Sequence, residues 1–353
     1  VDMMSLIKEY DLPYEFPEPV LKEAKKINQE VDVKNIKNRR DLRDQEIFTI
    51  DGEDAKDLDD AVNVEKLENG NYQLGVHIAD VSHYVKEGSF LDKEAILRGT
   101  SVYMLDRVIP MLPVELSNGI CSLNAGKDRF AISCVMEINS KGQVVSSDIF
   151  KSVIKVTERM SYTSVQKILD DSDKEITKRY ADYIEHFKRM EELAHILKNR
   201  RAKDGSLNLD IPETKVVLNE KGIAIDIKKY ELTFANEIIE QFMLTANETV
   251  AEKFFWLEAP FIYRVHEAPD MEKVTELNKF LFNLGYRVKC NKEEVHPTAF
   301  ADVLEKIKGK PEEMVISNLV LRTLKVARYE SENKGHFGIA SKYYCHFTSP
   351  IRR

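Results

Sequence analysis

The sequence predicts an α+β fold, a single large domain in which a mixed, mainly antiparallel sheet is surrounded by helices. Short β-type runs joined by hairpin turns fill much of the first half, and apolar residues at helical spacing dominate the second half. A chain of 353 residues with 43% apolar content can bury a large core. No internal repeat or glycine-serine linker divides it, so we expect one domain over residues 39–353 after a lead-in segment over residues 1–38.

The first half is expected to consist of one short helix followed by strands and turns. Glu18–Val31 is typical of an amphipathic helix, and Asn38–Asp44 then leads into the first strand. A turn at Asn69-Gly70 predicts an antiparallel hairpin whose returning strand lies within Tyr72–Val85. A second hairpin is expected from two runs rich in β-branched residues, Ala131–Ile138 and Val144–Val156.

The second half is expected to be mostly helical. Apolar spacing predicts a helix over Lys174–Arg201, and Val216–Ile227 is typical of a hairpin that turns at Glu220–Gly222. The longest helix is expected over Phe234–Phe255, where one apolar stripe continues until Pro260 ends it. Two residues lie seven apart on a more polar face of that helix, and solvent exposure is their simplest interpretation: Glu240 and Asn247.

Composition indicates a cytoplasmic protein without a membrane segment. The chain has no run of eighteen or more apolar residues, and its first residues lack the basic-then-apolar layout of a secretory signal. The four cysteines are far apart with no C-x₂-C pair, which argues against a zinc site and favours buried, reduced thiols. They are Cys121, Cys134, Cys290 and Cys345.

The net charge of −8 counts against a generic nucleic-acid binder, whose surface is basic. That objection is weaker if positive charge is concentrated along one groove. Each basic cluster alone is more typical of a solvated face. The clusters are Arg39 with Arg40 and Arg43, residues 198–203, and Arg352 with Arg353.

Five aspartates lie within ten residues in the segment IDGEDAKDLDDAV, and four of them form the candidate site: Asp51, Asp57, Asp59 and Asp60. Two unit charges about 4 Å apart repel by roughly 1 kcal/mol in water and about 4 kcal/mol at an effective dielectric of 20, so converging carboxylates need a counter-charge. An acidic run is usually a solvated loop. Here apolar β-formers flank the run on both sides, which favours a site for a hard cation such as Mg²⁺. The spacing does not fit a calcium-binding EF-hand loop.

The last residues, GHFGIASKYYCHFTSPIRR, form the second informative passage. Ser349-Pro350 is a good N-cap and first-turn signature, so a helix is expected to begin there. Its free N–H groups, together with Arg352 and Arg353, would suit an anion. The alternative is a helix start with two solvated arginines. An acidic metal segment and an arginine-bearing helix start together suggest phosphoryl transfer with a metal-bound water as nucleophile.

Other catalytic machinery is not visible in the sequence. There is no Walker P-loop, no H-E-x-x-H, no G-x-S-x-G and no G-x-G-x-x-G motif. The expected hairpin would carry His77 and Asp80 towards the aspartates. A lone histidine is more often a satisfied core residue, so His77 receives no ligand role.

Several of these segments, in this order, resemble the ribonuclease II and ribonuclease R family, and their wording is nearer to the ribonuclease R branch. The segments are RRDLRD, IDGEDAKDLDDAV, HIADVSHYV, IPMLPVELSNGICSLN and HFTSPIRR. The resemblance runs from about residue 39 to the end and concerns the catalytic domain, known as RNB. Family members continue beyond S-P-I-R-R and carry cold-shock and S1 modules that are not visible here, so the resemblance implies a domain truncated at its carboxyl end.

The resemblance implies a processive, hydrolytic 3′→5′ exoribonuclease that degrades single-stranded RNA to nucleoside 5′-monophosphates. It implies Mg²⁺ as cofactor, with two ions, and leaves open whether Mn²⁺ substitutes. Asp51, Asp57 and Asp60 match the family's metal-holding aspartates. Asp59 matches the residue regarded as most critical for turnover, by organising the second metal and the attacking water. We treat the four as one site.

The resemblance also implies roles for five further residues. Arg352 would offset charge on the scissile phosphate, and Arg353 would contact RNA. Tyr103 matches a position near an aromatic clamp on the RNA, with a core tyrosine as the alternative. Tyr162 and Glu240 match positions near the last nucleotides, where a buried glutamate would accept the ribose 2′-hydroxyl.

The competing hypothesis is a non-catalytic RNA-binding or scaffold protein of the same fold. Such a protein is expected to have lost at least one of the four aspartates, and none is missing. A calcium-stabilised structural domain would need a ligand spacing that the sequence lacks. We expect a monomer that binds single-stranded RNA. The sequence does not indicate partners in RNA decay or on the ribosome.

Overall fold

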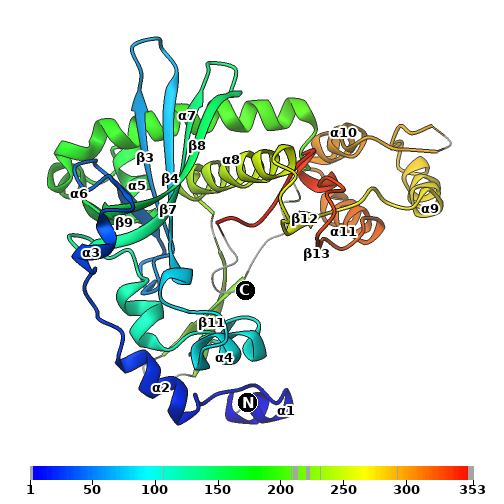
Figure 1. Cartoon of the computed structure of the whole chain (residues 1–353). Helices are drawn as coiled ribbons and strands as arrows, with labels where there is room; N and C mark the ends of the chain where they lie inside the picture. Colours follow the sequence, from blue (N-terminus) through cyan, green and yellow to red (C-terminus); the bar gives the residue numbers. More distant parts are fainter. Residues whose placement is uncertain are drawn as a thin grey trace.

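A seven-stranded sheet forms the centre of the chain (Figure 1). The computed structural model describes residues 3–105, 107–207, 209, 214–219, 223–230, 232–291 and 293–348. The strand order is β1-β8-β7-β4-β3-β2-β9. The strands are β1 (Arg40–Asp41), β2 (Phe48–Asp51), β3 (Asp60–Lys66), β4 (Tyr72–Ala79), β7 (Asp128–Ile138), β8 (Val144–Lys155) and β9 (Glu158–Ser161).

The sheet is mixed and mainly antiparallel, as predicted. The β2–β3, β3–β4, β4–β7 and β7–β8 pairs are antiparallel, and only β1–β8 and β2–β9 are parallel. Both predicted hairpins are confirmed. The first turns through Gly70, whose φ of 82° is easily adopted by glycine, and pairs Lys66 with Tyr72.

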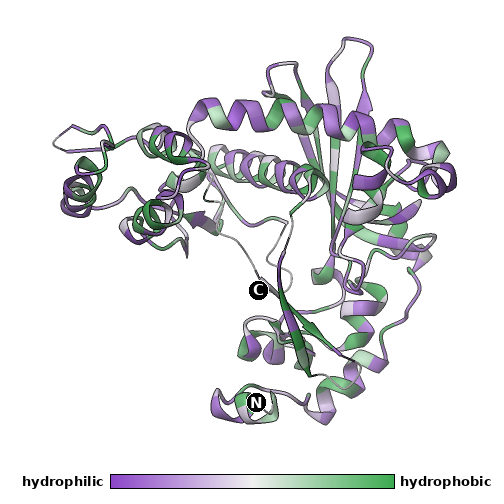
Figure 2. Ribbon diagram, turned by 180° about the vertical axis from the view of Figure 1, so that it is seen from behind, coloured by the Kyte–Doolittle hydropathy of each residue, from purple (hydrophilic) through white to green (hydrophobic). Residues whose placement is uncertain are grey.

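Helices cover one face of the sheet and complete the main core. These are α5 (Tyr162–Leu169), α7 (Ile184–Asp204) and α8 (Phe234–Trp256). The two long helices α7 and α8 run side by side along the sheet (Figure 1). In Figure 2 hydrophobic and hydrophilic residues alternate along both, as expected for helices with one face on a core. The predicted long helix from Phe234 is therefore confirmed.

Two predicted helices differ from the structure in length. Lys174–Arg201 is divided into α6 (Lys174–Arg179), a 3-10 turn η3 (Ala181–Tyr183) and α7. The break lies at Tyr180, whose φ and ψ of −108° and 27° are not helical and whose ring packs into the main core. The helix expected over Glu18–Val31 ends at Lys25, as α2 (Glu18–Lys25), and the Asn28 side chain then accepts from the N–H of Glu30 in a local turn.

Two smaller clusters lie outside the main core. One lies under the aspartate segment and includes Leu58, Leu123 and Ile154. The other joins α2 to α4 (Phe90–Arg98) and η2 (Glu115–Ile120), a π-helical segment. The remaining short elements of this region are α1 (Met3–Glu9), α3 (Val33–Ile36), η1 (Val81–His83), β5 (Val102–Tyr103) and β6 (Val108–Ile109).

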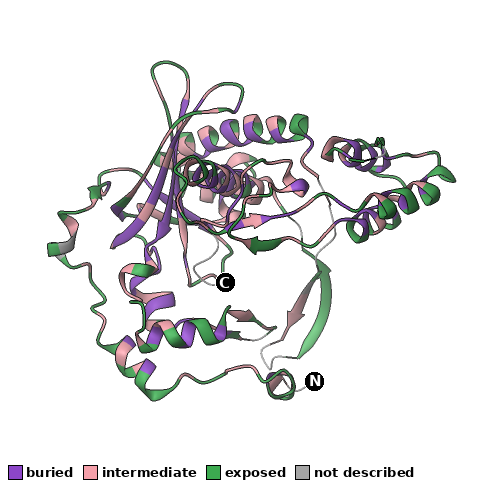
Figure 3. Ribbon diagram, turned by 45° about the vertical axis from the view of Figure 1, so that its right-hand side comes forward, coloured by how far each residue is buried: buried purple, intermediate pink, exposed green. Residues whose placement is uncertain are grey.

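A helical lobe with its own core lies to one side of the sheet (Figure 1). It contains α9 (Met271–Phe282), α10 (Pro297–Ile307) and α11 (Glu313–Thr323), and it joins the body beside β12 (Tyr263–Val265), β13 (Arg328–Glu330) and η4 (Phe337–Ile339). Figure 3 shows buried residues concentrated in the sheet and inner helix faces, with more exposure on this lobe. The sequence did not predict the lobe as a separate cluster.

The hairpin predicted over Val216–Ile227 is confirmed as β10 (Thr214–Leu218) paired with β11 (Ala224–Lys229). Its predicted turn at residues 220–222 lies outside the described residues. Across the described ranges, no helix combines the length and the apolar character that a bilayer crossing requires. The four cysteines are free thiols, and all but Cys290 are buried.

Candidate functional site

The predicted aspartates meet at one edge of the sheet. Asp51 is the last residue of β2, and Asp60 is the first residue of the neighbouring antiparallel strand β3. The segment between them therefore starts and ends at the same sheet edge. The Ala79 N–H donates to the Asp59 carbonyl oxygen at 3.0 Å, which extends the β3–β4 ladder by one residue. Register and chain order together bring Asp51, Asp59 and Asp60 to one place.

The carboxylates at this edge are crowded enough to perturb one another. Burial, followed by the negative charges of Asp51 and Asp59, raises the pKa of Asp60 to about 8. A carboxyl whose pKa lies near neutrality is costly to ionise when no cation is present. This is the electrostatic situation that the four-aspartate spacing predicted.

Asp57 is joined to the predicted aromatic residue Tyr103. The Tyr103 hydroxyl donates to Asp57 Oδ2 at 2.9 Å. Tyr103 is 62% exposed, so the alternative interpretation as a core tyrosine is wrong. Its ring is open to solvent while its hydroxyl is fixed, an arrangement that suits stacking against a base next to the aspartates.

Tyr162 also lies at the aspartate edge. It is the first residue of α5, directly after Ser161, which pairs with Asp51 in the parallel β2–β9 ladder. Burial, followed by the charges of Asp51 and Asp60, raises the pKa of the Tyr162 hydroxyl above its usual range. The hydroxyl therefore stays protonated at neutral pH and can act as a donor.

The acidic segment is held in place by residues that the sequence did not single out. Arg159 Nη2 donates to the carbonyl oxygens of Glu53 and Ala55 at 2.9 and 2.6 Å. Leu58, between two aspartates, is 1% exposed and packs in the cluster under the segment. Arginine and leucine are common in any chain, and only the fold shows that these two fix the segment.

Glu240 lies on α8 but is exposed, so the expectation of a buried glutamate is wrong. The inward positions of the helix are taken by residues such as Ile238, Ile239 and Phe242. A contact of Glu240 with an RNA ribose stays a prediction.

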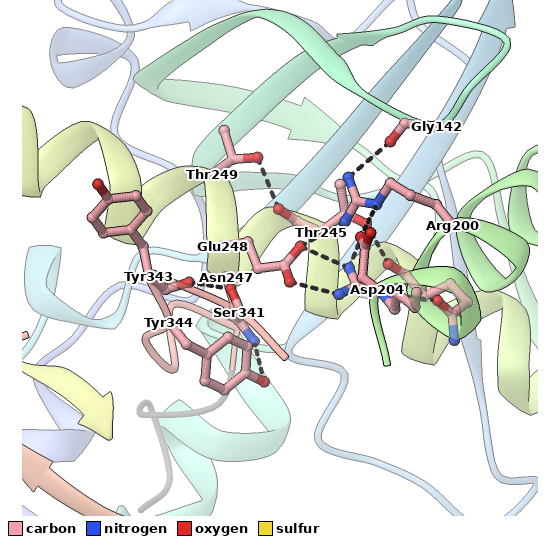
Figure 4. A network of polar contacts seen from close by, with 12 residues as sticks. Gly142, Arg200, Asp204, Thr245, Asn247, Glu248, Thr249, Ser341, Tyr343 and Tyr344 are labelled. Atoms are coloured by element: carbon pink, nitrogen blue, oxygen red, sulfur yellow. Dashed lines mark hydrogen bonds and ion pairs between the residues drawn. The ribbon is translucent and has the colours of Figure 1, made fainter. Parts of the chain in front are cut away.

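Asn247, for which exposure was the simplest interpretation, is instead buried at 2%. Its Oδ1 accepts from the Thr348 N–H at 2.9 Å, and its Nδ2 donates to the Tyr344 hydroxyl at 3.3 Å. Figure 4 shows Asn247 and Tyr344 facing each other. Asn247 thus fixes the chain immediately before the predicted helix start, although Ser349, Pro350, Arg352 and Arg353 lie outside the described residues.

His77 is a core residue, as predicted. It is fully buried in β4, with Nδ1 2.7 Å from Ser133 Oγ and Nε2 3.0 Å from Asn63 Oδ1. Burial lowers its pKa to about 3, so the ring is neutral. Asp80, which follows the same strand, forms a buried ion pair with Arg39 at 2.5 Å.

Two basic clusters are engaged in ion pairs, and their interpretation as solvated faces is wrong for the buried members. Arg39 and Arg201 each have side chains only 4% exposed. The first cluster forms the pairs Arg39–Asp80, Arg40–Asp148, Arg43–Asp41 and Arg43–Asp128. In the second cluster, Arg200 binds Glu248 (Figure 4), and Arg201 binds the same carboxylate. These arginines are committed to protein carboxylates.

The donor set at the sheet edge fits a hard divalent cation. Within the described ranges, no three side chains of His, Cys, Asp or Glu form a ready-made metal cage. Mg²⁺ does not need one, since it keeps several waters and is usually held by one or two carboxylates together with substrate phosphates. Burial and then the charges of Asp51 and Asp59 raise the Asp60 pKa, and a bound cation would favour the ionised carboxylates.

Comparison with known proteins gives consistent matches. The RNB domain profile matches residues 39–353. Ribonuclease R of Thermotoga maritima is 51% identical over 100% of this chain, and ribonuclease R 1 of Lactococcus lactis is 48% identical over 100% of it. The chain covers 50% and 43% of those two proteins, so it spans about half the length of these curated relatives.

Solved structures show the same fold. RNase R of Mycoplasma genitalium in complex with ribose-methylated single-stranded RNA has a TM-score of 0.93 and 31% identity, covering 100% of this chain and 55% of that one. Its complex with double-stranded RNA matches with the same TM-score. Yeast Ssd1, described as a pseudonuclease, has a TM-score of 0.74 at 24% identity over 92% of this chain and 40% of its own, and that likeness concerns the fold alone.

Proposed function

Because the chain belongs to the RNB domain family, we propose that it is the catalytic region of a hydrolytic exoribonuclease that degrades single-stranded RNA processively from its 3′ end. The products would be nucleoside 5′-monophosphates. The observation that carries the proposal is the crowding of Asp51, Asp59 and Asp60 at one sheet edge, where burial and then the charges of Asp51 and Asp59 raise the Asp60 pKa. Sites that perturb a titratable group in this way are candidates for function.

The proposed roles follow from where each aspartate lies. Asp51, Asp57 and Asp60 would hold Mg²⁺, with two ions in all, and Asp59 would orient the attacking water. When bound, the ions would lower the pKa of that water and stabilise charge on both the attacking and the leaving oxygens. Tyr103 keeps Asp57 oriented through its hydroxyl.

RNA would approach the aspartates past aromatic side chains. The exposed ring of Tyr103 offers a stacking surface that accepts any base. The protonated Tyr162 hydroxyl, near Asp51 and Asp60, can donate to a phosphate or ribose oxygen. Arg352 and Arg353, four and five residues after Thr348, would offset charge on the phosphates. We further propose that residues 39–353 form the domain and residues 1–38 its lead-in.

A non-catalytic RNA-binding or scaffold role is the second candidate. The match to a yeast protein described as a pseudonuclease favours keeping it, because that match shows that this fold does not by itself include catalysis. The two candidates differ in the aspartates, since a scaffold has no need to hold like charges together. All four are present here.

The direct test is incubation of the chain with 5′-labelled single-stranded RNA and Mg²⁺, with EDTA as control. A processive 3′→5′ exonuclease leaves one short labelled end product without intermediates, and it releases 5′-monophosphates. Intact RNA in the presence of Mg²⁺, with binding retained, would support the scaffold role. Labelled fragments of intermediate length that arise by internal cleavage would indicate an endonuclease.

Selection of RNA over DNA tests the role of Glu240. Replacing Glu240 by Ala is expected to relax discrimination against a matching DNA strand, because a 2′-hydroxyl partner would be lost. The matched control is Glu252→Ala, an exposed glutamate on the same helix. Unchanged selectivity in both variants would remove Glu240 from the site.

A further inference from the structure

One buried side chain outside the acidic segment holds the backbone on both sides of Asp57. Ser122 is fully buried. Its Oγ donates to the Lys56 carbonyl oxygen at 2.9 Å and accepts from the Leu58 N–H at 3.1 Å. A serine hydroxyl can donate one hydrogen and accept with its lone pairs, and here both functions are used on the backbone of the acidic segment. The two bonded residues, Lys56 and Leu58, lie on either side of Asp57, and Leu58 also directly precedes Asp59.

A main-chain bond and apolar packing reinforce the attachment. The Leu123 N–H donates to the Leu58 carbonyl oxygen at 2.9 Å. The Leu58 side chain packs against a cluster that includes Leu123 and Ile154. Leu58 therefore anchors the segment between Asp57 and Asp59.

Ser122 is itself fixed to the sheet. Its carbonyl oxygen accepts from Arg129 Nε at 2.8 Å, and Arg129 is a buried residue of β7. The Ser122 N–H donates to the Gly119 carbonyl oxygen at 3.1 Å. A continuous path of hydrogen bonds thus runs from a central strand through Ser122 to the backbone that carries Asp57 and Asp59.

Such a path matters because the carboxylates repel one another. A segment free to move would relieve this repulsion by spreading its carboxylates apart. A site that binds a cation needs its ligands held by supporting hydrogen bonds, whose loss typically weakens metal affinity by about 10- to 100-fold.

We propose that Ser122 is a positioning residue of the metal centre, which holds Lys56–Leu58 so that Asp57 and Asp59 are preorganised for a divalent cation. The proposal rests on the proposed function, since it assumes that the aspartates bind metal. It assigns Ser122 no contact with the cation or with RNA. Its effect acts through the backbone of the acidic segment.

The test compares Mg²⁺ affinity, measured by titration calorimetry on the chain without RNA, with stability in EDTA. Ser122→Ala is expected to bind Mg²⁺ about ten-fold or more weakly. Ser122→Thr keeps the hydroxyl and is expected to retain most of the affinity. Ser122→Cys keeps the volume but replaces the hydroxyl with a weaker donor and acceptor, and it is expected to fall between the two. If Ser122→Ala does not fold, the Thr and Cys variants carry the comparison.

The matched control is Ser152→Ala. Ser152 is also fully buried, and its Oγ lies 2.7 Å from Ser133 Oγ and 3.3 Å from the Ala131 carbonyl oxygen. It belongs to β8, which β7 and β4 separate from β3. This variant is expected to lose stability but keep its Mg²⁺ affinity, which distinguishes a positioning effect from a general loss of buried hydrogen bonds.

The outcomes separate this inference from the function on which it rests. Unchanged Mg²⁺ affinity in Ser122→Ala, or in Ser122→Cys if the alanine variant is unfolded, overturns the positioning role and leaves the metal centre intact. An equal loss of affinity in Ser152→Ala also overturns it. If the unaltered chain binds no Mg²⁺, the metal centre fails, and the role of Ser122 fails with it.

Discussion

Asp60 occupies a position that is unfavourable for stability and suited to binding a cation. It begins β3 at the edge where β2 ends in Asp51, and its pKa is raised to about 8 by burial and then by the charges of Asp51 and Asp59. Proteins keep strained electrostatics of this kind where function requires them. The sequence predicted the crowding from spacing alone. It did not predict that the Asp60 pKa would be raised by burial, because burial depends on how the strands pack.

The raised pKa of Asp60 is expected to destabilise the chain when no cation is present. With a pKa of about 8 when folded and 3.8 when unfolded, Asp60 must take up a proton on folding near neutral pH in EDTA. Asp60→Asn keeps the shape of the side chain and needs no proton, so its free energy of unfolding in EDTA is expected to rise by at least about 1 kcal/mol. Added Mg²⁺ is expected to stabilise the unaltered chain more than the variant. Urea denaturation with and without Mg²⁺ measures both effects.

The control for this comparison is Asp302→Asn, on the exposed side of α10 in the helical lobe. It is expected to change stability by less than about 0.5 kcal/mol and to leave the Mg²⁺ response intact. A less stable Asp60→Asn in EDTA would contradict the claim that the Asp60 pKa is raised.

His77 is expected to make the chain sensitive to acid. Its pKa is about 3 when folded and 6.5 when unfolded, so the unfolded chain binds the extra proton between these pH values. Its contribution to stability is present above pH 6.5 and decreases by about 1.4 kcal/mol per pH unit as pH falls towards 3. His77→Gln, which can still donate to Asn63, should show a shallower decrease. An identical pH dependence of the urea midpoint would show that His77 is not the cause.

At the scale of elements, the sequence predicted those whose signal is local. The Asn-Gly hairpin, the β7–β8 pair and α8 each carry their own periodicity or turn residues and were confirmed. The division between α6 and α7 at Tyr180 was missed, because the Tyr180 ring packs into the core while its backbone is not helical, and apolar spacing does not show this. Asn247 was misjudged for a similar reason. Its polar partners come from residues about a hundred positions later, which helical periodicity cannot indicate.

The network between α7 and α8 tests the energetic link between these elements. Arg201 makes bonds to Glu248, Gln241 and Thr245, whereas its neighbour Arg200 is more exposed and bonds Glu248 and the Gly142 carbonyl oxygen (Figure 4). Arg201→Met is expected to lower the free energy of unfolding by about 3 kcal/mol, because it leaves buried acceptors without their donor.

Arg200→Met is the matched control, and its expected cost is about 1 kcal/mol, since its side chain is 21% exposed and Glu248 keeps its bonds to Arg201. Thermal or urea denaturation of both variants gives the comparison. Equal costs would show that burial of the Arg201 ion pair does not control packing of α7 on α8.

At the scale of the whole molecule, the fold brings together segments that are far apart in the sequence. The acidic segment, the Ser122 region and the start of α5 converge on one sheet edge although a hundred residues separate their ends. The α+β class followed from hairpins and helical periodicity, but this convergence follows from strand order, which those patterns did not predict. The helical lobe was missed because apolar spacing predicts that a segment is helical but not which other helices it packs against.

The fold alone does not determine whether a protein is catalytic. A pseudonuclease matches this architecture at a TM-score of 0.74, so the sheet and its helices do not require catalysis. The chain has a net charge of −8, and the described arginines of two basic clusters are bound to protein carboxylates. We therefore propose that catalysis would depend on the aspartates at the sheet edge.

The most direct measurement compares RNA turnover and RNA affinity in the chain and in Asp59→Asn, both with saturating Mg²⁺. The variant keeps the shape of the side chain and the carbonyl that accepts from Ala79. The expected result is a loss of turnover of at least about 100-fold with RNA affinity unchanged within a few-fold, as for removal of a group that acts only in the transition state. Equal turnover in the two proteins would contradict the proposal that these aspartates form the catalytic centre.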